Sequence, residues 1–323
     1  MRRKRLIEID IASGIAISLV VFGHLSDYDP SWYGICKNTL YKFHMPFFMF
    51  ISGFLLSYTG ENYKDFQSIK QFIFSKVIRF GIPYLFMSFL FLIVKIGLKE
   101  YSSENSIFAQ VLAIFIEPTS GPSIFLWYIY VLFQFYVVFT LLHLISLIKK
   151  HQFLLIGIGL VLYLFESVSN IFVLNLFCKY FLFFSIGFVT VNYHSNFKIF
   201  IKNNGFLAVL VFILLIILDL SIVIQVPTLV MGLISIPVFT YLSTRIKNNK
   251  ILEYIGQSTF VIYIWNSVFI FVLSFLFKSI DADFLGNFGF YLPFMVFAGI
   301  YGPLAMRTAS RKLGFQFLKK IFP

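Results

Sequence analysis

Long apolar runs alternate with short polar segments along the whole chain. Each run is about 18 to 25 residues long, the length that an α-helix needs to cross a hydrocarbon layer about 30 Å thick. We place ten such runs at residues 6–25, 39–59, 77–98, 123–147, 152–172, 175–192, 205–222, 226–243, 258–277 and 287–306. The pattern predicts an all-α polytopic membrane protein, a bundle of about ten transmembrane helices.

Composition excludes an ordinary soluble fold. Of the 323 residues 59% are hydrophobic and 12% charged, with a mean hydropathy of +0.88, whereas a soluble domain has about a quarter of its residues charged. The net charge of +12 does not indicate nucleic-acid binding, because the basic residues are scattered over several loops. The two cysteines, Cys36 and Cys178, lack metal-ligand spacing, so we expect no metal site.

Basic residues set the expected orientation. If the N-terminus is cytoplasmic, 20 of the 26 lysines and arginines fall in inner segments, as the positive-inside rule requires. Both termini are then cytoplasmic. The basic leader resembles a signal peptide, but no small-residue cleavage site precedes Asp27, so we expect a retained anchor. No segment between runs is long enough for a soluble domain, which predicts a single membrane domain over residues 1–323.

The first apolar run carries an unusual set of polar side chains: Glu8, Asp10, Ser13, Ser18 and His24. At 100° per residue Asp10 and Ser13 both lie within about 40° of the face of His24, and about 21 Å separates Asp10 from His24 along the axis. Ionisable groups within a membrane usually mark a functional site, so this stripe predicts a path across the membrane. The alternatives are a solvated imidazole at a helix end for His24 and, for the two acids, stabilisation of the helix dipole.

Three later positions are further candidates. His44 precedes Pro46, which suits a first helical turn, so we expect His44 just outside a helix start and level with His24, where two imidazoles could share a proton transfer. Arg79 at a cytoplasmic boundary could bind an anionic ligand or snorkel to lipid phosphate. Trp127 matches the aromatic belt at the outer interface.

Several segments together resemble the membrane-bound acyltransferase-3 family. They are IDIASGIAISLVVFGH from Ile9 to His24, FHMPFFMFISG from Phe43 to Gly53, Arg79 with the following Pro83-Tyr84, LWY at 126–128 and IGQSTFVIYI at 255–264. The resemblance covers most of the chain. It implies a bundle that passes an acyl group, usually acetyl, from cytoplasmic acyl-CoA to a hydroxyl of a cell-surface glycan or its lipid-linked precursor, with no tightly bound cofactor.

The resemblance also implies roles for individual residues. His24 matches the histidine most closely tied to catalysis, as a base or as a carrier of the acyl group, and Asp10 belongs to the same catalytic stripe. We expect the remaining candidates to bind the acyl donor or the substrate: His44, Arg79, Ser13, Trp127 and Asn266. The implied partners are acyl-CoA, the glycan acceptor and membrane lipids, and a homo-oligomer is compatible with them. Abundant Phe, Ile, Lys and Asn suit a bacterial plasma-membrane protein.

Two positions depart from the family pattern. Ser13 stands where the family commonly has Arg or Lys, and Asn266 stands where a motif often ends in His; Asn forms hydrogen bonds but does not shuttle protons. The alternative function is therefore that of a catalytically degenerate relative acting in polysaccharide export or assembly, and a receptor or structural role is a third class.

Overall fold

The computed structural model describes residues 5–25, 30–59, 66–97, 106–142, 144–145, 151–165, 169–221, 224–246, 249–281 and 283–313. All regular secondary structure in these ranges is helical, which confirms the all-α prediction. The described residues fall into two compact units. Several basic residues behind the predicted orientation, among them Arg2, Arg3 and Lys4, lie outside the described ranges.

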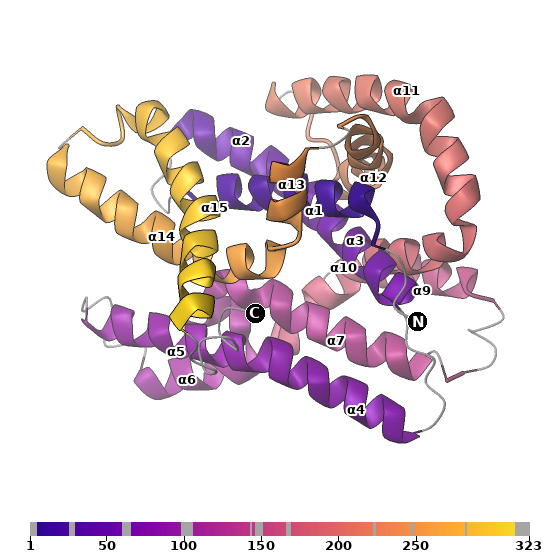
Figure 1. The fold of residues 1–323 in the computed structure, drawn as a ribbon, viewed down its shortest axis with the longest axis horizontal. Coiled ribbons are helices and arrows are strands. Elements are labelled where there is room, and N and C mark those ends of the chain that lie inside the picture. Colours follow the sequence, from indigo (N-terminus) through magenta and orange to yellow (C-terminus); the bar gives the residue numbers. More distant parts are fainter. Residues whose placement is uncertain are drawn as a thin grey trace. The chain divides into compact units, whose positions relative to one another are not determined.

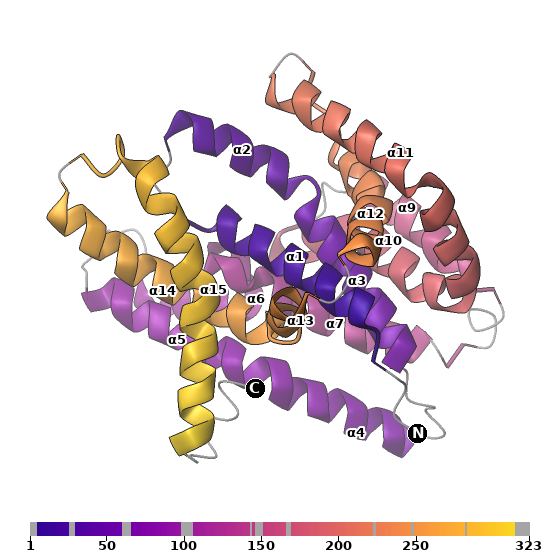
Figure 2. The ribbon, with the colours of Figure 1, turned by 45° about the horizontal axis from the view of Figure 1, so that its top comes forward.

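The first unit comprises the described residues of Met1–Ile51 and Thr190–Phe315. Its helices are α1 (Ile7–Gly23), α2 (Ser31–Tyr41), the first half of α3 (His44–Thr59), α11 (His194–Leu220), α12 (Thr228–Arg245), α13 (Lys250–Gly256), α14 (Thr259–Ile280) and α15 (Phe288–Leu313). Figures 1 and 2 both show α1 beside α13 and α14 beside α15. The N-terminal helix therefore packs against elements from the last quarter of the chain.

The second unit comprises the described residues of Ser52–Val189. After the second half of α3, its helices are α4 (Phe66–Lys76), α5 (Ile82–Gly97), α6 (Ile107–Ile116), α7 (Trp127–Leu142), α9 (Phe153–Leu164) and α10 (Leu174–Thr190). A π-helical turn, Val77–Gly81, joins α4 to α5, and short 3₁₀ turns lie at Pro118–Ser120, Ile124–Leu126, Ile171–Val173 and, at the boundary with the first unit, Val191–Tyr193.

Within the described ranges, seven helical stretches are long and apolar enough to cross a membrane: Ser31–Thr59, Phe66–Gly97, Ile124–Leu142, Ile171–Leu220, Thr228–Arg245, Thr259–Ile280 and Phe288–Lys312. Ile171–Leu220 runs for 50 residues and contains two of the predicted spans. The predicted spans 6–25 and 152–172 correspond to the shorter helices α1 and α9, of 17 and 12 residues. Every predicted span thus contains a helix, while the count of ten remains a prediction.

The structure contains helices that the hydropathy pattern did not predict. They are α2, α4, α6 and α13, each of 7 to 11 residues. Local capping explains two of them. The side chain of Ser106 accepts a hydrogen bond from Ala109 N in α6, and that of Asn249 accepts from Leu252 N in α13, so each helix begins with a satisfied donor.

Close backbone contact fixes α1 against α13. A Cβ atom on Gly256 would lie 1.8 Å from the carbonyl oxygen of Asp10, and one on Gly14 would lie 2.3 Å from that of Leu252. Small residues allow this approach, as is usual at helix contacts in membranes. Glycine at these two positions therefore allows the short distance between the backbones of α1 and α13.

Candidate functional site

His24 and Asn266 meet at the C-terminal end of α1. His24 follows directly after the helix, and its Nδ1 lies 3.2 Å from Oδ1 of Asn266 in α14. Asn266 is fully buried. The contact joins positions 242 residues apart, so the fold brings together two residues that the sequence analysis had assigned separately.

The hydrogen bonds of Asn266 determine the tautomer of His24. The Asn266 amide nitrogen donates to the carbonyl oxygens of Ile262 and Tyr263, at 2.9 and 2.6 Å. Its oxygen, which only accepts, therefore faces His24, so Nδ1 of His24 carries the proton. The lone pair of the neutral imidazole is then on Nε2. This is the arrangement that a general base or a nucleophile requires, and Asn266 acts as an orienting group.

Two tyrosines of α2 hold the backbone on which His24 is carried. The hydroxyl of the buried Tyr33 donates to the carbonyl oxygen of Phe22, and that of Tyr41 donates to the carbonyl oxygen of Gly23 at 2.8 Å. These carbonyls belong to the last turn of α1 and have no partner within the helix. The two hydroxyls therefore act as side-chain caps that fix the end of α1.

His44 is buried, with 1% of its surface exposed, and is the first residue of α3. The prediction that it lies just outside the helix is wrong, because α2 ends at Tyr41 and a two-residue turn leads directly into α3. Its Nδ1 lies 2.7 Å from the carbonyl oxygen of Leu40, which only accepts, so Nδ1 of His44 is also protonated. The His44 ring packs against that of Tyr41, with centroids 5.0 Å apart. Tyr41 thus touches both α1, beside His24, and His44.

A buried ion pair anchors the turn before His44. Asp219 of α11, with 3% of its side chain exposed, accepts hydrogen bonds from Lys42 Nζ at 2.6 Å and Thr39 Oγ1 at 2.7 Å. It also accepts from the backbone N–H of Val226 at 2.9 Å. The sequence analysis missed Asp219, although a carboxylate within a predicted span is a signal that finds such residues.

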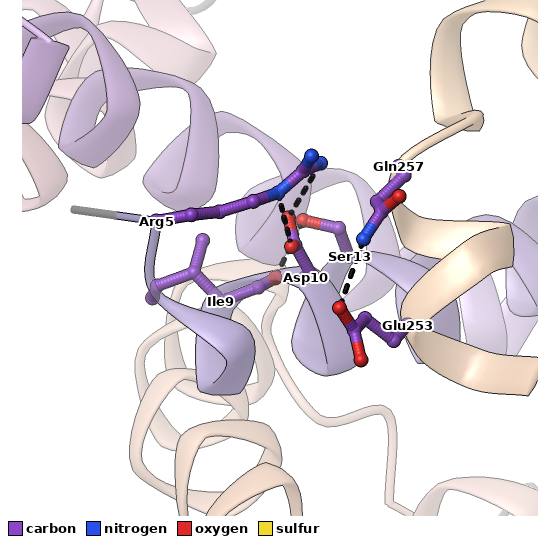
Figure 3. Close-up of polar contacts among 6 residues, drawn as sticks. All are labelled: Arg5, Ile9, Asp10, Ser13, Glu253 and Gln257. Carbon is purple, nitrogen blue, oxygen red and sulfur yellow. Dashed lines mark hydrogen bonds and ion pairs between the residues drawn. The ribbon is translucent and has the colours of Figure 1, made fainter. Parts of the chain in front are cut away.

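Asp10 lies at the other end of α1 from His24. Its carboxylate pairs with Arg5, whose Nε is 2.6 Å away, and the hydroxyl of the neighbouring Ser13 donates to the carbonyl oxygen of Ile9 at 2.8 Å (Figure 3). The structure does not bring Asp10 to His24. Ser13 stands where the family commonly has a cation, but Arg5 places a cation at the same end of α1. The sequence analysis did not predict the pairing of Arg5 with Asp10.

The second unit holds the other two candidates. Arg79 is exposed in the π-helical turn, with its guanidinium carbon 5.8 Å from the centre of the Phe80 ring. Trp127 begins α7 and stacks on Tyr180, with centroids 5.3 Å apart. A π-helical turn is rare and is frequent at functional sites. No three metal-ligating side chains gather anywhere in the described ranges.

Comparison with known proteins identifies the family. The profile of the acyltransferase domain of acyltransferase family 3 matches residues 6–306. The chain belongs to the acyltransferase-3 family. Together with its long apolar helices, this membership indicates a multi-pass membrane protein.

One curated relative is similar over a short segment. The chain is 44% identical over 59 residues to nodulation protein NolL of Mesorhizobium japonicum. The match covers 16% of the chain and 16% of that relative. No solved structure matches the chain. The family assignment therefore rests on the profile match, which extends over nearly the whole chain.

Proposed function

We propose that this protein is an O-acyltransferase of a bacterial plasma membrane that moves an acetyl or other short acyl group from cytoplasmic acyl-CoA to a hydroxyl of a cell-surface polysaccharide or its precursor. The observation that carries the proposal is the hydrogen bond from His24 Nδ1 to Asn266 Oδ1. It supports a catalytic rather than a degenerate site, because it leaves the lone pair on Nε2, where a base needs it.

In the proposed reaction, Nε2 of His24 removes the proton of the sugar hydroxyl while the oxygen attacks the thioester carbonyl. The C–S bond then breaks, and the thiolate of CoA takes the proton back from the imidazolium. In the covalent variant, Nε2 attacks the thioester carbonyl first, the C–S bond breaks and CoA leaves as the thiolate. The sugar oxygen then attacks the acyl carbon, the C–Nε2 bond breaks, and the hydroxyl proton passes to the released Nε2 and from there to the thiolate. Asn266 accepts from Nδ1–H throughout both routes, so the imidazolium keeps a hydrogen-bond acceptor when it forms.

Other residues have supporting roles in the proposal. Tyr33 and Tyr41 fix the end of α1, and the buried His44 lies against Tyr41. Asp10 and Arg5 form a pair at the other end of α1, where the hydroxyl of Ser13 donates to the carbonyl oxygen of Ile9. Arg79 is proposed to contact the phosphates of acyl-CoA, and Trp127 to line the path of a substrate.

The test is mass analysis of surface glycan from a strain with and without the gene, after mild alkaline release of ester-linked acyl groups. We expect the acyl mass to disappear in the deletion strain and to return on complementation. The mass gives the acyl group, and the modified sugar fragment gives the acceptor. Unmodified glycan in the wild type, combined with a loss of glycan from the deletion strain, would instead support the export or assembly function.

We further propose a single membrane domain with ten spans and both termini in the cytoplasm. Reporter fusions after Lys202 and after Arg311 are expected to report the cytoplasm, and a fusion at Glu104, which is outside the described residues, the exterior. The basic residues of alternate segments support this topology. A cytoplasmic signal at Glu104 would contradict the map.

A further inference from the structure

Arg307, near the C-terminal end of α15, has an unusual hydrogen-bonding state. Its Nη1 donates to the hydroxyl oxygen of Ser258 at 2.8 Å, while its Nε is buried and has no hydrogen-bond partner among the described residues. A buried N–H without an acceptor costs about 1–3 kcal/mol, and more on a charged group. A native structure seldom keeps such a donor unless something else satisfies it.

No carboxylate compensates this charge in the part of the chain that the structure describes. The acids of the neighbouring elements are engaged elsewhere, Asp10 with Arg5 and Glu253 with the amide of Gln257 at 3.0 Å (Figure 3). One turn further along α15, the exposed Arg311 adds a second positive charge. Arg307 therefore forms no ion pair with a carboxylate of the described residues, and a second arginine lies one turn away on the same helix.

Ser258 provides the second half of the arrangement. It is the N-cap residue of α14 and is 2% exposed, yet its side chain does not cap the helix. Its oxygen accepts from Arg307, so its own hydroxyl proton can be donated to another group. Ser258 also lies at the N-terminus of α14, a helix of 22 residues, and therefore at the positive end of the helix dipole. Guanidinium, hydroxyl and helix N-terminus are each favourable to an anion with several oxygens.

Ordinary explanations for a terminal arginine do not account for these contacts. A snorkelling arginine keeps its guanidinium in water, as the exposed Arg311 does. A single hydrogen bond that links α14 to α15 needs only one donor, which a lysine could also provide. Such a link does not explain why Nε of Arg307 is buried. A favourable interaction with the helix dipole is equally available to Arg311 and does not require the contact with Ser258.

We infer that Arg307 and Ser258 form a phosphate-binding site, with the phosphates of the acyl-CoA donor as its ligand or, as the other source of the same chemistry, a lipid headgroup. The donor assignment rests on the proposed function. Position supports it: Ser258 and Asn266 are on one helix, about 12 Å apart at 1.5 Å per residue. The long pantetheine arm of CoA would extend from Arg307 toward Asn266 and His24.

The experiment measures binding, so that it does not depend on acyl transfer. Coenzyme A, and pantetheine as a probe without phosphate, are titrated onto the full-length protein in a phosphate-free maltoside detergent. In a second arm, short-chain phosphatidylglycerol is added and the unfolding temperature is followed. Arg307→Gln is compared with Arg311→Gln, which removes the same charge from the same helix. Arg307→Lys keeps the charge and the bond to Ser258, in case Arg307→Gln does not fold.

If the site holds the donor, Arg307→Gln weakens coenzyme A binding at least 10-fold, Arg311→Gln weakens it less than 3-fold, and pantetheine binding does not change. Arg307→Lys is expected to fall between, since Nε–H is lost. If the phosphate comes from lipid, Arg307→Gln abolishes the rise in unfolding temperature on adding phosphatidylglycerol and leaves coenzyme A binding intact.

The inference is overturned if Arg307→Gln and Arg311→Gln change coenzyme A binding and the phosphatidylglycerol-induced rise in unfolding temperature to the same extent. If Arg307→Gln does not fold, the inference is overturned when Arg307→Lys matches the wild type in both measurements. Failure of the proposed function is separable. A wild-type protein that binds coenzyme A through Arg307 but acylates no glycan would contradict that function and leave the phosphate site standing.

Discussion

The two units satisfy their buried groups in different ways. In the first unit, polar side chains pair across helices that are distant in sequence, as in His24 with Asn266 and Lys42 with Asp219. In the second, the buried side-chain pairs are between uncharged hydroxyls, as in Ser52 with Tyr128 and Ser88 with Ser123. Beside them lies an aromatic cluster with ring centroids 4.6 to 6.3 Å apart, which we define as Phe135, Phe139, Phe177, Phe181, Phe184 and Phe188.

The buried ion pair of Lys42 with Asp219 lies in the first unit, whereas cations over aromatic rings occur in both units, as Arg245 over Tyr241 in the first shows. Lys76 of the second unit lies over the rings of Phe72 and Tyr136, at 4.6 and 4.9 Å, and Arg79 lies over that of Phe80. Such contacts stabilise a cation by about 0.5–1 kcal/mol at exposed sites and do not fix a protonation state. On the proposed function, the first unit would position the reacting groups, and the second would supply packing and peripheral charge.

The largest expected effect is that of His24→Gln. Glutamine keeps hydrogen-bonding capacity but does not titrate or carry an acyl group, so acyl transfer in membrane vesicles should fall at least 10²-fold. The matched control is His151→Gln, an exposed histidine of the second unit, which should retain wild-type activity. Full activity in His24→Gln would exclude acid–base and covalent roles for this side chain.

Asn266→Leu should have the next largest effect. Leucine has a similar size but removes the acceptor that holds Nδ1–H of His24, and losing a buried hydrogen bond of this kind corresponds to about 10- to 100-fold in kcat. The KM for acyl-CoA should not change. Asn204→Leu is the control, because Asn204 makes the same bond to a carbonyl four residues earlier, Phe200, on an exposed face of α11. A rise in KM with constant kcat would contradict an orienting role.

Arg79→Ala should raise the KM for acyl-CoA up to about 5-fold, the range expected for an exposed charge. Arg79→Lys should restore part of the loss, since lysine lacks the bidentate geometry. Arg245→Ala provides the comparison: Arg245 is also an exposed arginine at a helix end over an aromatic ring, 4.9 Å from that of Tyr241. An unchanged KM in Arg79→Ala would return Arg79 to the lipid-snorkel interpretation.

The smallest effect on chemistry is expected for Phe184→Ala, in the aromatic cluster. Phe184 is fully buried, so its truncation should lower the free energy of unfolding by about 3–5 kcal/mol. The kcat per folded molecule should stay close to wild type. Phe153→Ala, at a position 58% exposed, should change neither quantity. A large loss of kcat in folded Phe184→Ala would place part of the catalytic function in the second unit.

Hydropathy predicted the helices well where a run was long and uniformly apolar. The run 6–25 became Ile7–Gly23, and 175–192 became Leu174–Thr190. It did not predict α2 or α4, because short helices of mixed polarity resemble loops when only average hydropathy is considered. The boundary at His44 was missed for the same reason, since α2 supplies the turn that starts α3.

Motif resemblance predicted His24 and Asn266 but not their contact. A pairing across 242 residues has no local signal, and Asn266 looked like a loss of function because asparagine does not titrate. Only the two donor bonds to Ile262 and Tyr263 reveal that its oxygen must face His24. Arg307 was not among the candidate site residues, because sequence gives no measure of whether one particular nitrogen is buried without an acceptor.

The π-helical turn at Val77–Gly81 has a consequence for how the second unit tolerates insertions and deletions. A π turn holds one more residue than the α-helical turn that it replaces, so the helix before it and the helix after it are offset by about 100° of rotation. Deleting one residue here would give a regular α-helix and also rotate every side chain of α5 away from its neighbours. The spacing of Lys76, Arg79 and Tyr84 is therefore a register that single-residue changes in length cannot preserve.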